Sequence, residues 1–318
     1  MTQLNLVCTL TDRTRPVVEG RIKVGDFDLN ITPGEPEDMF RIAMREARYD
    51  ITEMSMGSHI LSVARGDSRY IGVPVFPSRA FRHSAIYIRT DRGITGPQDL
   101  AGRVIGLPEY QQTAAVWVRG VLRDHYGVDL SGITWKVAGE RTPIILPPHI
   151  RKESIAEGQT LDAMLAAGEI DAVVAPRPPA CFVNGTAPVA RMFPDFRTHE
   201  EAYYTATGFF PIMHCIAIRR DVAAANPGLA MALYDAFSAA KKQALADAAM
   251  VNVLRVSLPW IASEVAKQTE FMGGDPWPYG FGRNRAEIAA MCGFSAADGL
   301  TSTTVVPEAL FAETTHGT

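Results

Sequence analysis

The chain has 318 residues, of which 47% are hydrophobic and 21% charged, values typical of a globular protein that is long enough for two domains. Its formal net charge is −4 and its pI is about 6.0, which excludes a broad basic surface for nucleic acid or an anionic membrane. The four scattered cysteines form no CxxC pair, so we expect free thiols rather than a disulfide framework.

The first ten residues alternate apolar and polar side chains, which predicts a strand. A secretory leader would instead need a basic start followed by an apolar run of about 7–15 residues. No uncharged apolar run approaches the ~18 residues of a membrane span. We therefore expect a cytoplasmic protein without a membrane partner.

Residues 11–92 predict an alternation of strands and helices. A polar turn at 11–16 follows the first strand, and Pro36 stands where a helix begins, with apolar residues at three and four spacing up to Ala47. A strand over 49–55 and a helix over 58–64 come next. The strand over 71–76 is expected to break at Pro77, and another strand follows over 85–88.

The middle and the end of the chain continue this pattern. Short strands are predicted at 104–107, 133–137 and 170–175. A helix is predicted after Thr113 with its end at Gly127, and a short helix over 161–167. A proline-rich loop is expected around His149. A long helical region is expected from 226 through 264, then an aromatic loop at 275–282, a helix and a frayed tail over 313–318.

This order of elements predicts an α/β fold with mostly parallel sheets covered by helices. Such sheets bind ligands beyond the carboxyl ends of their strands. The candidate site is therefore formed by the polar segments at those ends: 11–15, 53–55, 78–84, 109–113 and 176–177.

The segment PVFPSRAFRHSAIYIR, residues 74–89, concentrates the most chemistry. Two guanidiniums, an imidazole and two hydroxyls lie within seven residues between two predicted strands. Guanidinium forks bind carboxylates in a bidentate way, and histidine exchanges a proton near neutral pH. Surface ion pairing is the alternative interpretation of the same arginines.

Two further patterns resemble the type II periplasmic-binding-protein fold: DLAGRVIGLP and LDAMLAAGEIDAVVAP, at 99–108 and 161–176. The resemblance implies two lobes, each with a mostly parallel sheet flanked by helices, and a ligand cleft between them. Lobe 1 would comprise residues 1–92 and 205–318, and lobe 2 would be the inserted residues 93–204.

Three longer segments resemble the 4,5-dihydroxyphthalate decarboxylase family: 74–89, GLPEYQQTAAVWVRGVLRDHYGV at 106–128 and DPWPYGFGRN at 275–284. The resemblance covers nearly the whole chain. It implies non-oxidative conversion of 4,5-dihydroxyphthalate to protocatechuate and carbon dioxide, in phthalate degradation and without an organic cofactor. The implied partner is a small aromatic dicarboxylate.

This reaction sets three tasks: holding two adjacent carboxylates, protonating the ring carbon that loses one of them, and managing the phenols. Arg79 and Arg82 suit the first task, mainly on the carboxylate that stays. His83 is the preferred proton donor, with Glu109, Glu53 and His214 as alternatives.

Several other predicted site residues also have a structural interpretation. His214 lies in an apolar strand, where a lone histidine is more often part of the core. Thr113 either caps a helix or binds an anion at the helix start, and the aromatic loop either contacts the substrate ring or packs against a lobe. The predicted substrate contacts are Arg13, Ser55, Ser78, Ser84, Tyr110, Thr113, Arg177, His214, Trp277 and Tyr279.

A divalent metal is the main open question, since His59, His83 and His214 could meet Glu53 in space although no HxH, HxxxH or HExxH motif is present. Two rival functions also remain: a solute-binding protein or sensor for an aromatic dicarboxylate, and a lyase acting on another cyclic carboxylate. The sequence leaves open whether the chain forms a homo-oligomer.

Overall fold

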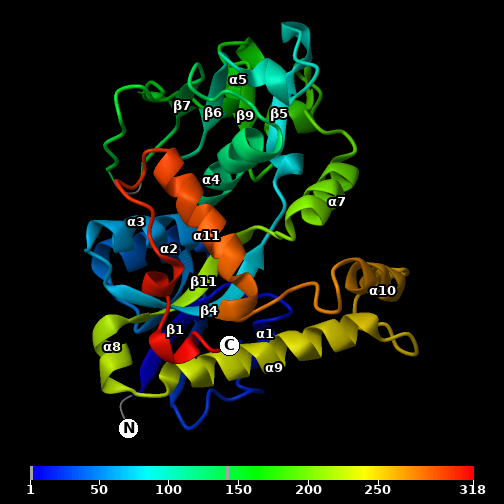
Figure 1. Cartoon of the computed structure of the whole chain (residues 1–318). Coiled ribbons are helices and arrows are strands. Elements are labelled where there is room, and N and C mark those ends of the chain that lie inside the picture. Colours follow the sequence, from blue (N-terminus) through cyan, green and yellow to red (C-terminus); the bar gives the residue numbers. More distant parts are fainter. Residues whose placement is uncertain (1–2, 141–142) are drawn as a thin grey trace.

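The computed structural model describes residues 3–140 and 143–318, which form two mixed sheets flanked by helices (Figure 1). The first sheet has the order β2-β1-β3-β11-β4, and the second has the order β10-β5-β9-β6-β7-β8. The strands of the first sheet are β1 (Leu4–Cys8), β2 (Leu29–Pro33), β3 (Ile51–Ser55), β4 (Tyr70–Arg79) and β11 (Ile212–Arg219). Those of the second are β5 (Ile86–Arg89), β6 (Val104–Leu107), β7 (Thr134–Val137), β8 (Arg151–Ser154), β9 (Ala172–Val174) and β10 (Val189–Arg191).

The α-helices surround these sheets, and most of them are short. Their bounds are α1 (Arg15–Val18), α2 (Pro36–Glu46), α3 (Met56–Arg65), α4 (Thr113–Gly120), α5 (Leu161–Ala167), α6 (Ala180–Val183), α7 (Phe196–Thr207), α8 (Arg220–Ala225), α9 (Leu229–Ala249), α10 (Ile261–Phe271) and α11 (Phe281–Ala297). A π-helical turn, Val121–His125, extends α4. No described helix is long and apolar enough to cross a membrane.

Most of the predicted helices and strands are present in the structure. In each of them the spacing of the apolar residues in the sequence matches the side of the element that packs against the core. The expectation of mostly parallel sheets is confirmed, since β1, β2, β3 and β4 of the first sheet run in one direction. Strand β11 enters it antiparallel to both β3 and β4, after the chain has returned from the second sheet. The interlobe boundary at residue 92 stays a prediction, although β5 already pairs within the second sheet.

Three local predictions are corrected by the structure. Strand β4 does not break at Pro77 but continues to Arg79, paired with β11 across a register shift. The long helical region ends at Ala249 and resumes only at Ile261. The C-terminal tail is docked rather than frayed, since the carbonyl of Thr318 accepts a 2.7 Å hydrogen bond from the amide of Gly282.

Candidate active site

A carboxylate–histidine pair lies at the carboxyl end of β3. Glu53 is fully buried, and its Oε1 is 2.6 Å from Nδ1 of His214 on the neighbouring strand β11. Its Oε2 accepts hydrogen bonds from the amide and the hydroxyl of Thr9, at 2.8 and 2.6 Å. Burial alone would raise the pKa of Glu53, but the bonds from His214 and Thr9 hold that pKa below its usual range.

The strand pairing explains why these two side chains meet. His214 pairs with Ser55 on one side and Ser78 on the other, and the register of β11 against β4 shifts on both sides of His214. Such irregularities often re-aim a side chain next to active sites. The His214 side chain keeps 18% exposure, and the structure places no hydrogen-bond partner from residues 3–140 or 143–318 on its Nε2. The pair therefore presents one ring nitrogen for proton exchange.

Two helices begin beside this pair. Ser55, the last residue of β3, precedes α3, and its hydroxyl is 2.8 Å from that of Thr113, the first residue of α4. The amide of Gly57 donates to the same Thr113 oxygen at 3.0 Å. Neither N-cap residue, Ser55 for α3 or Gln112 for α4, caps its own helix with its side chain, and the Thr113 hydroxyl accepts from an amide in the first turn of α3. Because helix N-termini carry partial positive charge, this junction of the two sheets favours an anion.

Arg13 adds a cation to the same end of the first sheet. Its Nε donates to the carbonyl of Pro77 at 2.7 Å, its Nη1 pairs with Asp12 at 2.9 Å, and its guanidinium lies 4.1 Å from the ring centre of Trp277. The indole nitrogen of Trp277 is itself fixed by the carbonyl of Phe76. The guanidinium is thus held rigidly, with Nη2 unpaired in the part of the chain that the structure describes.

The hydroxyl of Tyr279 is buried and has no hydrogen-bond partner among the described residues. Burial raises the pKa of this phenol, and the negative charge of Glu53 raises it further. The positive charges of Arg13 and Arg79 act in the opposite direction and lower it. Tyr279 therefore stays protonated and can donate a hydrogen bond near these charges.

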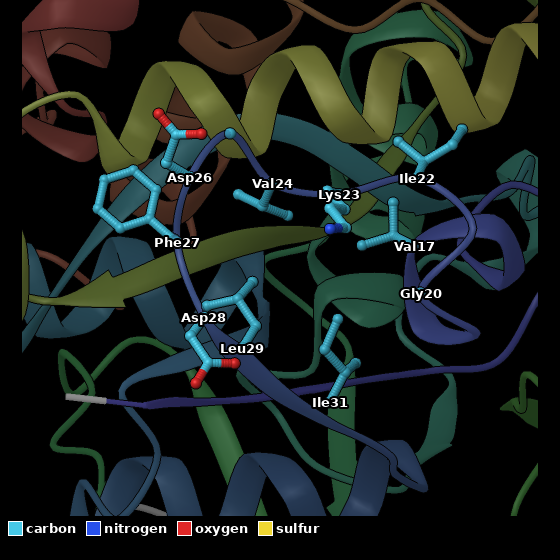
Figure 2. A pocket seen from close by; sticks show the side chains of 11 residues that line it. Val17, Gly20, Ile22, Lys23, Val24, Asp26, Phe27, Asp28, Leu29 and Ile31 are labelled. Atoms are coloured by element: carbon cyan, nitrogen blue, oxygen red, sulfur yellow. The ribbon is translucent and has the colours of Figure 1, made fainter. Parts of the chain in front are cut away.

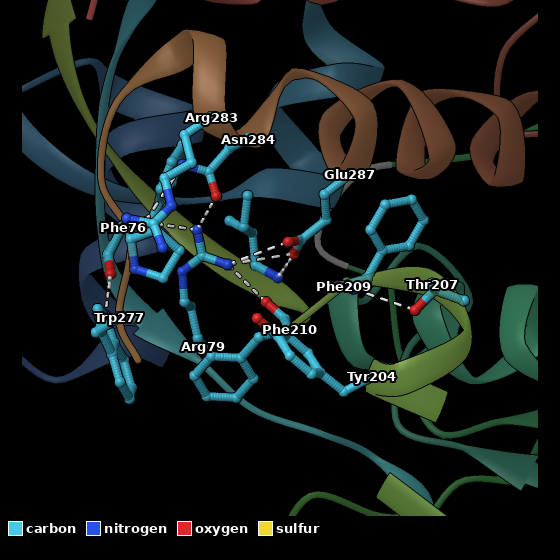
Figure 3. A network of polar contacts seen from close by, with 12 residues as sticks. Phe76, Arg79, Tyr204, Thr207, Phe209, Phe210, Trp277, Arg283, Asn284 and Glu287 are labelled. Carbon is cyan, nitrogen blue, oxygen red and sulfur yellow. Dashed lines mark hydrogen bonds and ion pairs between the residues drawn. The ribbon is translucent and has the colours of Figure 1, made fainter. Parts of the chain in front are cut away.

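Arg79 is a structural residue rather than an open carboxylate ligand (Figure 3). Its side chain is 0% exposed and pairs with Glu287 at 3.2 Å and with Asn284. It also donates to the carbonyls of Phe210 and Pro278, at 2.6 and 2.7 Å. The geometry therefore argues against the predicted substrate role, because four acceptors already hold this guanidinium between β4 and α11.

Replacing Arg79 with methionine is expected to destabilise the protein by about 3–5 kcal/mol, since it leaves the buried Glu287 carboxyl without its partner. Urea unfolding followed by circular dichroism would measure the loss. Arg283→Met is the matched control, because Arg283 is about half exposed. A loss below about 1 kcal/mol for Arg79→Met, as for exposed pairs, would contradict the structural role.

His83 lies in an aromatic cluster instead of beside the substrate-binding candidates. Its buried ring contacts Tyr126, Phe193 and Tyr203 at centroid distances of 5.3–5.8 Å. Burial lowers the pKa of His83 to about 4, and His199 adds to this effect. A neutral imidazole at pH 7 does not donate a proton readily, so this environment argues against the prediction for His83.

The neighbours of His83 face helix α7. Arg82 contacts Met213 through its Nε at 3.3 Å. Its positive charge lowers the pKa of Glu200, against the larger effect of burial, which raises it. The amide of Ser84 donates to the Glu200 carboxylate at 3.4 Å. The contact between Ser84 and Glu200 belongs to the connection between the two sheets. Arg82 contacts the residue next to His214, and its substrate-binding role stays a prediction.

Glu200 gives this connection a pH dependence. Burial raises the pKa of Glu200 to about 7, so between pH 4.5 and 7 the folded state binds more protons there than the unfolded state. The contribution of Glu200 to stability therefore falls as pH rises through this window. We expect Glu200→Gln to gain stability relative to the parent protein from pH 4.5 to 7, measured by thermal melting at each pH. A constant difference would contradict the assignment.

The remaining predicted residues are dispersed. Tyr110 is buried, donates to the carbonyl of Asp298 at 3.2 Å and packs under Arg119. Glu109 is half-buried in the turn before α4. Ser78 lies opposite His214. Arg177, 86% exposed, pairs with Glu37 at 3.6 Å and so links the end of β9 to α2.

The metal ligands considered from the sequence do not assemble. His59 bonds through Nε2 to the carbonyl of Leu310, and His83 lies in its aromatic cluster. Within residues 3–140 and 143–318, no group of three or more His, Cys, Asp or Glu side chains is placed to hold a metal ion. The participation of a metal stays an open prediction.

A pocket of about 440 Å³ lies elsewhere, between α1 and β2 (Figure 2). Its walls are largely apolar, and its charged residues Lys23, Asp26 and Asp28 are exposed. It contains none of the predicted site residues, so we do not consider it a catalytic centre.

Thr9 lies outside the strand-end segments predicted from the sequence, whereas Gln111 and Gln112 belong to the predicted segment 109–113 without an assigned role. Thr9 directly follows β1, and a polar residue at that strand end was a usable signal. The two glutamines belong to the polar bend before Thr113, yet only the structure shows that their side chains hold buried oxygens without a protein partner.

Comparison with solved structures defines the class of fold. The periplasmic aliphatic sulphonate binding protein SsuA from Escherichia coli aligns over 99% of each chain with a TM-score of 0.56 and 12% identity. The alkanesulfonate-binding protein SsuA from Xanthomonas axonopodis pv. citri, bound to MOPS, aligns over 98% of each chain with a TM-score of 0.54 and 12% identity. The chain therefore has the periplasmic-binding-protein-like α/β fold, as expected.

Curated relatives define the family, although no protein-family profile matches the chain. The 4,5-dihydroxyphthalate decarboxylase of Comamonas testosteroni is 40% identical over 316 residues, covering 97% of this chain and 96% of the relative. The enzyme of the same name from Pseudomonas putida is 42% identical over 218 residues, covering 66% and 84%. The chain belongs to the 4,5-dihydroxyphthalate decarboxylase family, a family of carboxy-lyases, which confirms the resemblance.

Proposed function

We propose that this chain converts 4,5-dihydroxyphthalate to protocatechuate and carbon dioxide. The names of its curated relatives support the reaction. The observation that carries the proposal is the buried Glu53–His214 pair, which lies beside a rigid guanidinium and two helix N-termini. Such a set can bind an aromatic dianion and exchange a proton with it.

The chemistry requires protonation at carbon. In 4,5-dihydroxyphthalate each carboxylate-bearing carbon has a hydroxyl para to it, which stabilises the cationic or dienone-like intermediate. A proton adds to that carbon, the bond to the carboxylate breaks, and its electron pair restores the aromatic ring as carbon dioxide leaves. The enzyme must therefore deliver a proton to the ring face.

We assign proton delivery to His214 in place of His83. The Glu53 carboxylate orients the ring by accepting from Nδ1, which leaves Nε2 to donate. Thr9 fixes the other carboxylate oxygen, so Glu53 cannot easily turn away. The low pKa of Glu53 keeps its carboxylate anionic, so Glu53 can accept a hydrogen bond from Nδ1 of His214.

We assign the retained carboxylate to Arg13 and the paired helix starts at Ser55 and Thr113. Arg13 offers its unpaired Nη2, on a guanidinium that Trp277 and the Pro77 carbonyl hold in place. Strong binding of the retained group positions the ring without stabilising the carboxylate that must leave.

The test is incubation of the purified protein with 4,5-dihydroxyphthalate, followed by chromatography for protocatechuate and by carbon dioxide release. Parallel reactions contain EDTA, zinc or manganese, so the same experiment tests whether a metal ion takes part in the reaction. Stoichiometric product in any reaction supports the proposal. Substrate binding without product in all of them would overturn it in favour of a solute-binding protein.

A further inference from the structure

Exposed apolar side chains gather on one arm of the molecule, which we define as residues 250–272. The arm comprises the loop after α9, the helix α10 and the residue that follows it. Of the ten large hydrophobic side chains that are exposed in residues 3–140 and 143–318, six belong to the arm, with exposed fractions of 45–79%. They are Val251, Val253, Leu254, Leu258, Trp260 and Phe271. Such a concentration marks a binding surface, whereas single exposed hydrophobic residues are normal.

The fold of this chain leaves the arm uncovered. The far end of α9 and the helix α10 project beyond both sheets (Figure 1). No residue of α10 or of the loop 250–260 is buried, although α10 contains Ile261, Val265 and Phe271. A surface helix of a globular protein normally buries its apolar residues against a core. The apolar residues of the arm therefore lack full cover from their own chain.

The arm is nevertheless held in place against α7. Arg197 of α7 pairs with Glu264 at 3.1 Å, and the hydroxyl of Tyr204 donates to the carbonyl of Met272 at 3.3 Å. The ring of Phe271 lies 5.5 Å from that of Tyr204, measured between centroids. Because these contacts already order the arm, a partner can bind it with a small loss of conformational entropy.

The size of the exposed apolar surface fits a contact between two folded proteins. Six side chains with the exposed fractions given above present roughly 600–700 Å², and each partner in a standard protein interface buries roughly 800 Å². An exposed tryptophan at the centre of the sequence of the arm, Trp260, is also the type of residue that contributes most to such interfaces.

The charges of the arm suit a second copy of the same arm. Its two cations, Arg255 and Lys267, balance its two anions, Glu264 and Glu270, whereas a surface for an anionic membrane or nucleic acid would carry an excess of basic residues. Arg255 and Glu270 are exposed, and neither forms an ion pair with another described residue. In a twofold contact each surface meets an identical one, so one unpaired cation and one unpaired anion complement each other twice.

We propose that the arm is the surface through which two copies of this chain bind each other. In this contact Trp260 and its apolar neighbours on one arm pack against those on the other. The inference concerns assembly and goes beyond the proposed function, because it holds whether or not the protein turns over a substrate.

The test is size-exclusion chromatography with light scattering on the parent protein and on Trp260→Glu, which places a charge in the contact. We expect the parent protein to form a dimer or a multiple of it, and Trp260→Glu to raise the dissociation constant for self-association at least about 30-fold. Val306→Glu is the matched control, because Val306 is also exposed and lies outside the arm. A monomeric parent, an unchanged mass for Trp260→Glu, or an equal effect of the control would overturn the inference.

Two further measurements keep the test specific. Leu258→Ser is a second variant with the same expected effect, and circular dichroism of each variant checks that the protein is folded. Dissociation in a folded variant supports the inference, whereas dissociation that occurs only in unfolded variants would overturn it. Sedimentation of the parent protein with phosphatidylcholine vesicles, lost in Trp260→Glu, would overturn it in favour of a lipid surface.

Discussion

Replacing His214 with glutamine is expected to lower kcat for decarboxylation about 10³-fold while KM changes only a few-fold. Glutamine can still accept or donate at the position of Nδ1, but it cannot transfer a proton to carbon near neutral pH. The Glu53 carboxylate, 2.6 Å from the imidazole, would keep its bonds to Thr9. Steady-state kinetics with chromatographic detection of protocatechuate would measure both parameters.

The matched control is His83→Phe, which keeps a ring among Tyr126, Phe193 and Tyr203. We expect kcat within about 5-fold of the parent value, because burial lowers the pKa of His83 to about 4 and its ring packs among aromatic side chains. Comparable losses for the two histidines, or a larger loss for His83→Phe, would contradict the assignment of His214 as the proton donor.

Replacing Arg13 with glutamine is expected to raise KM about 10- to 100-fold, the equivalent of the roughly 1.5–3 kcal/mol of a hydrogen bond to a charged group. Arg13→Lys should recover only part of the loss, since an ammonium does not reproduce the guanidinium fork that Trp277 and Pro77 position. Titration of inhibitor binding with phthalate would confirm that the defect lies in carboxylate recognition.

Arg15→Gln provides the control for Arg13. Arg15 carries the same charge two residues away, but its side chain is 51% exposed and pairs with Glu19 on the surface. Its loss should leave KM within about 2-fold, because exposed pairs contribute little. If both variants raised KM equally, the effect would come from overall charge, and Arg13 would lose its assigned contact.

Much of the fold could be predicted because local patterns specify it. The predicted bounds of β6 and α5 coincide with the structure, since apolar spacing and a helix-ending glycine are properties of a few neighbouring residues. The edge strands β2, β8 and β10 were not predicted. They carry few buried side chains, so no apolar alternation marks them.

The polar segments at the strand ends were also visible in the sequence, but the roles within them were not. The segment around residues 79–84 contains arginines and a histidine of the right chemical type. The structure uses Arg79 to join β4 to α11 through Glu287, which lies 208 residues away in the chain. The same kinds of side chain at Arg13 and His214 are left to face the candidate site.

The sequence by itself therefore determined the class of fold, the family and the strand ends that carry polar chemistry, because these depend on local spacing and on similarity along the chain. Only the tertiary structure shows which histidine pairs with a buried carboxylate and which arginine keeps a guanidinium nitrogen unpaired among the described residues. Glu53 and His214 are 161 residues apart, and their pairing exists only because β11 returns antiparallel beside β3. The burial of each side chain and its hydrogen-bond partners then set its protonation state. Both depend on residues that are distant in the sequence and cannot be derived from the residue type alone.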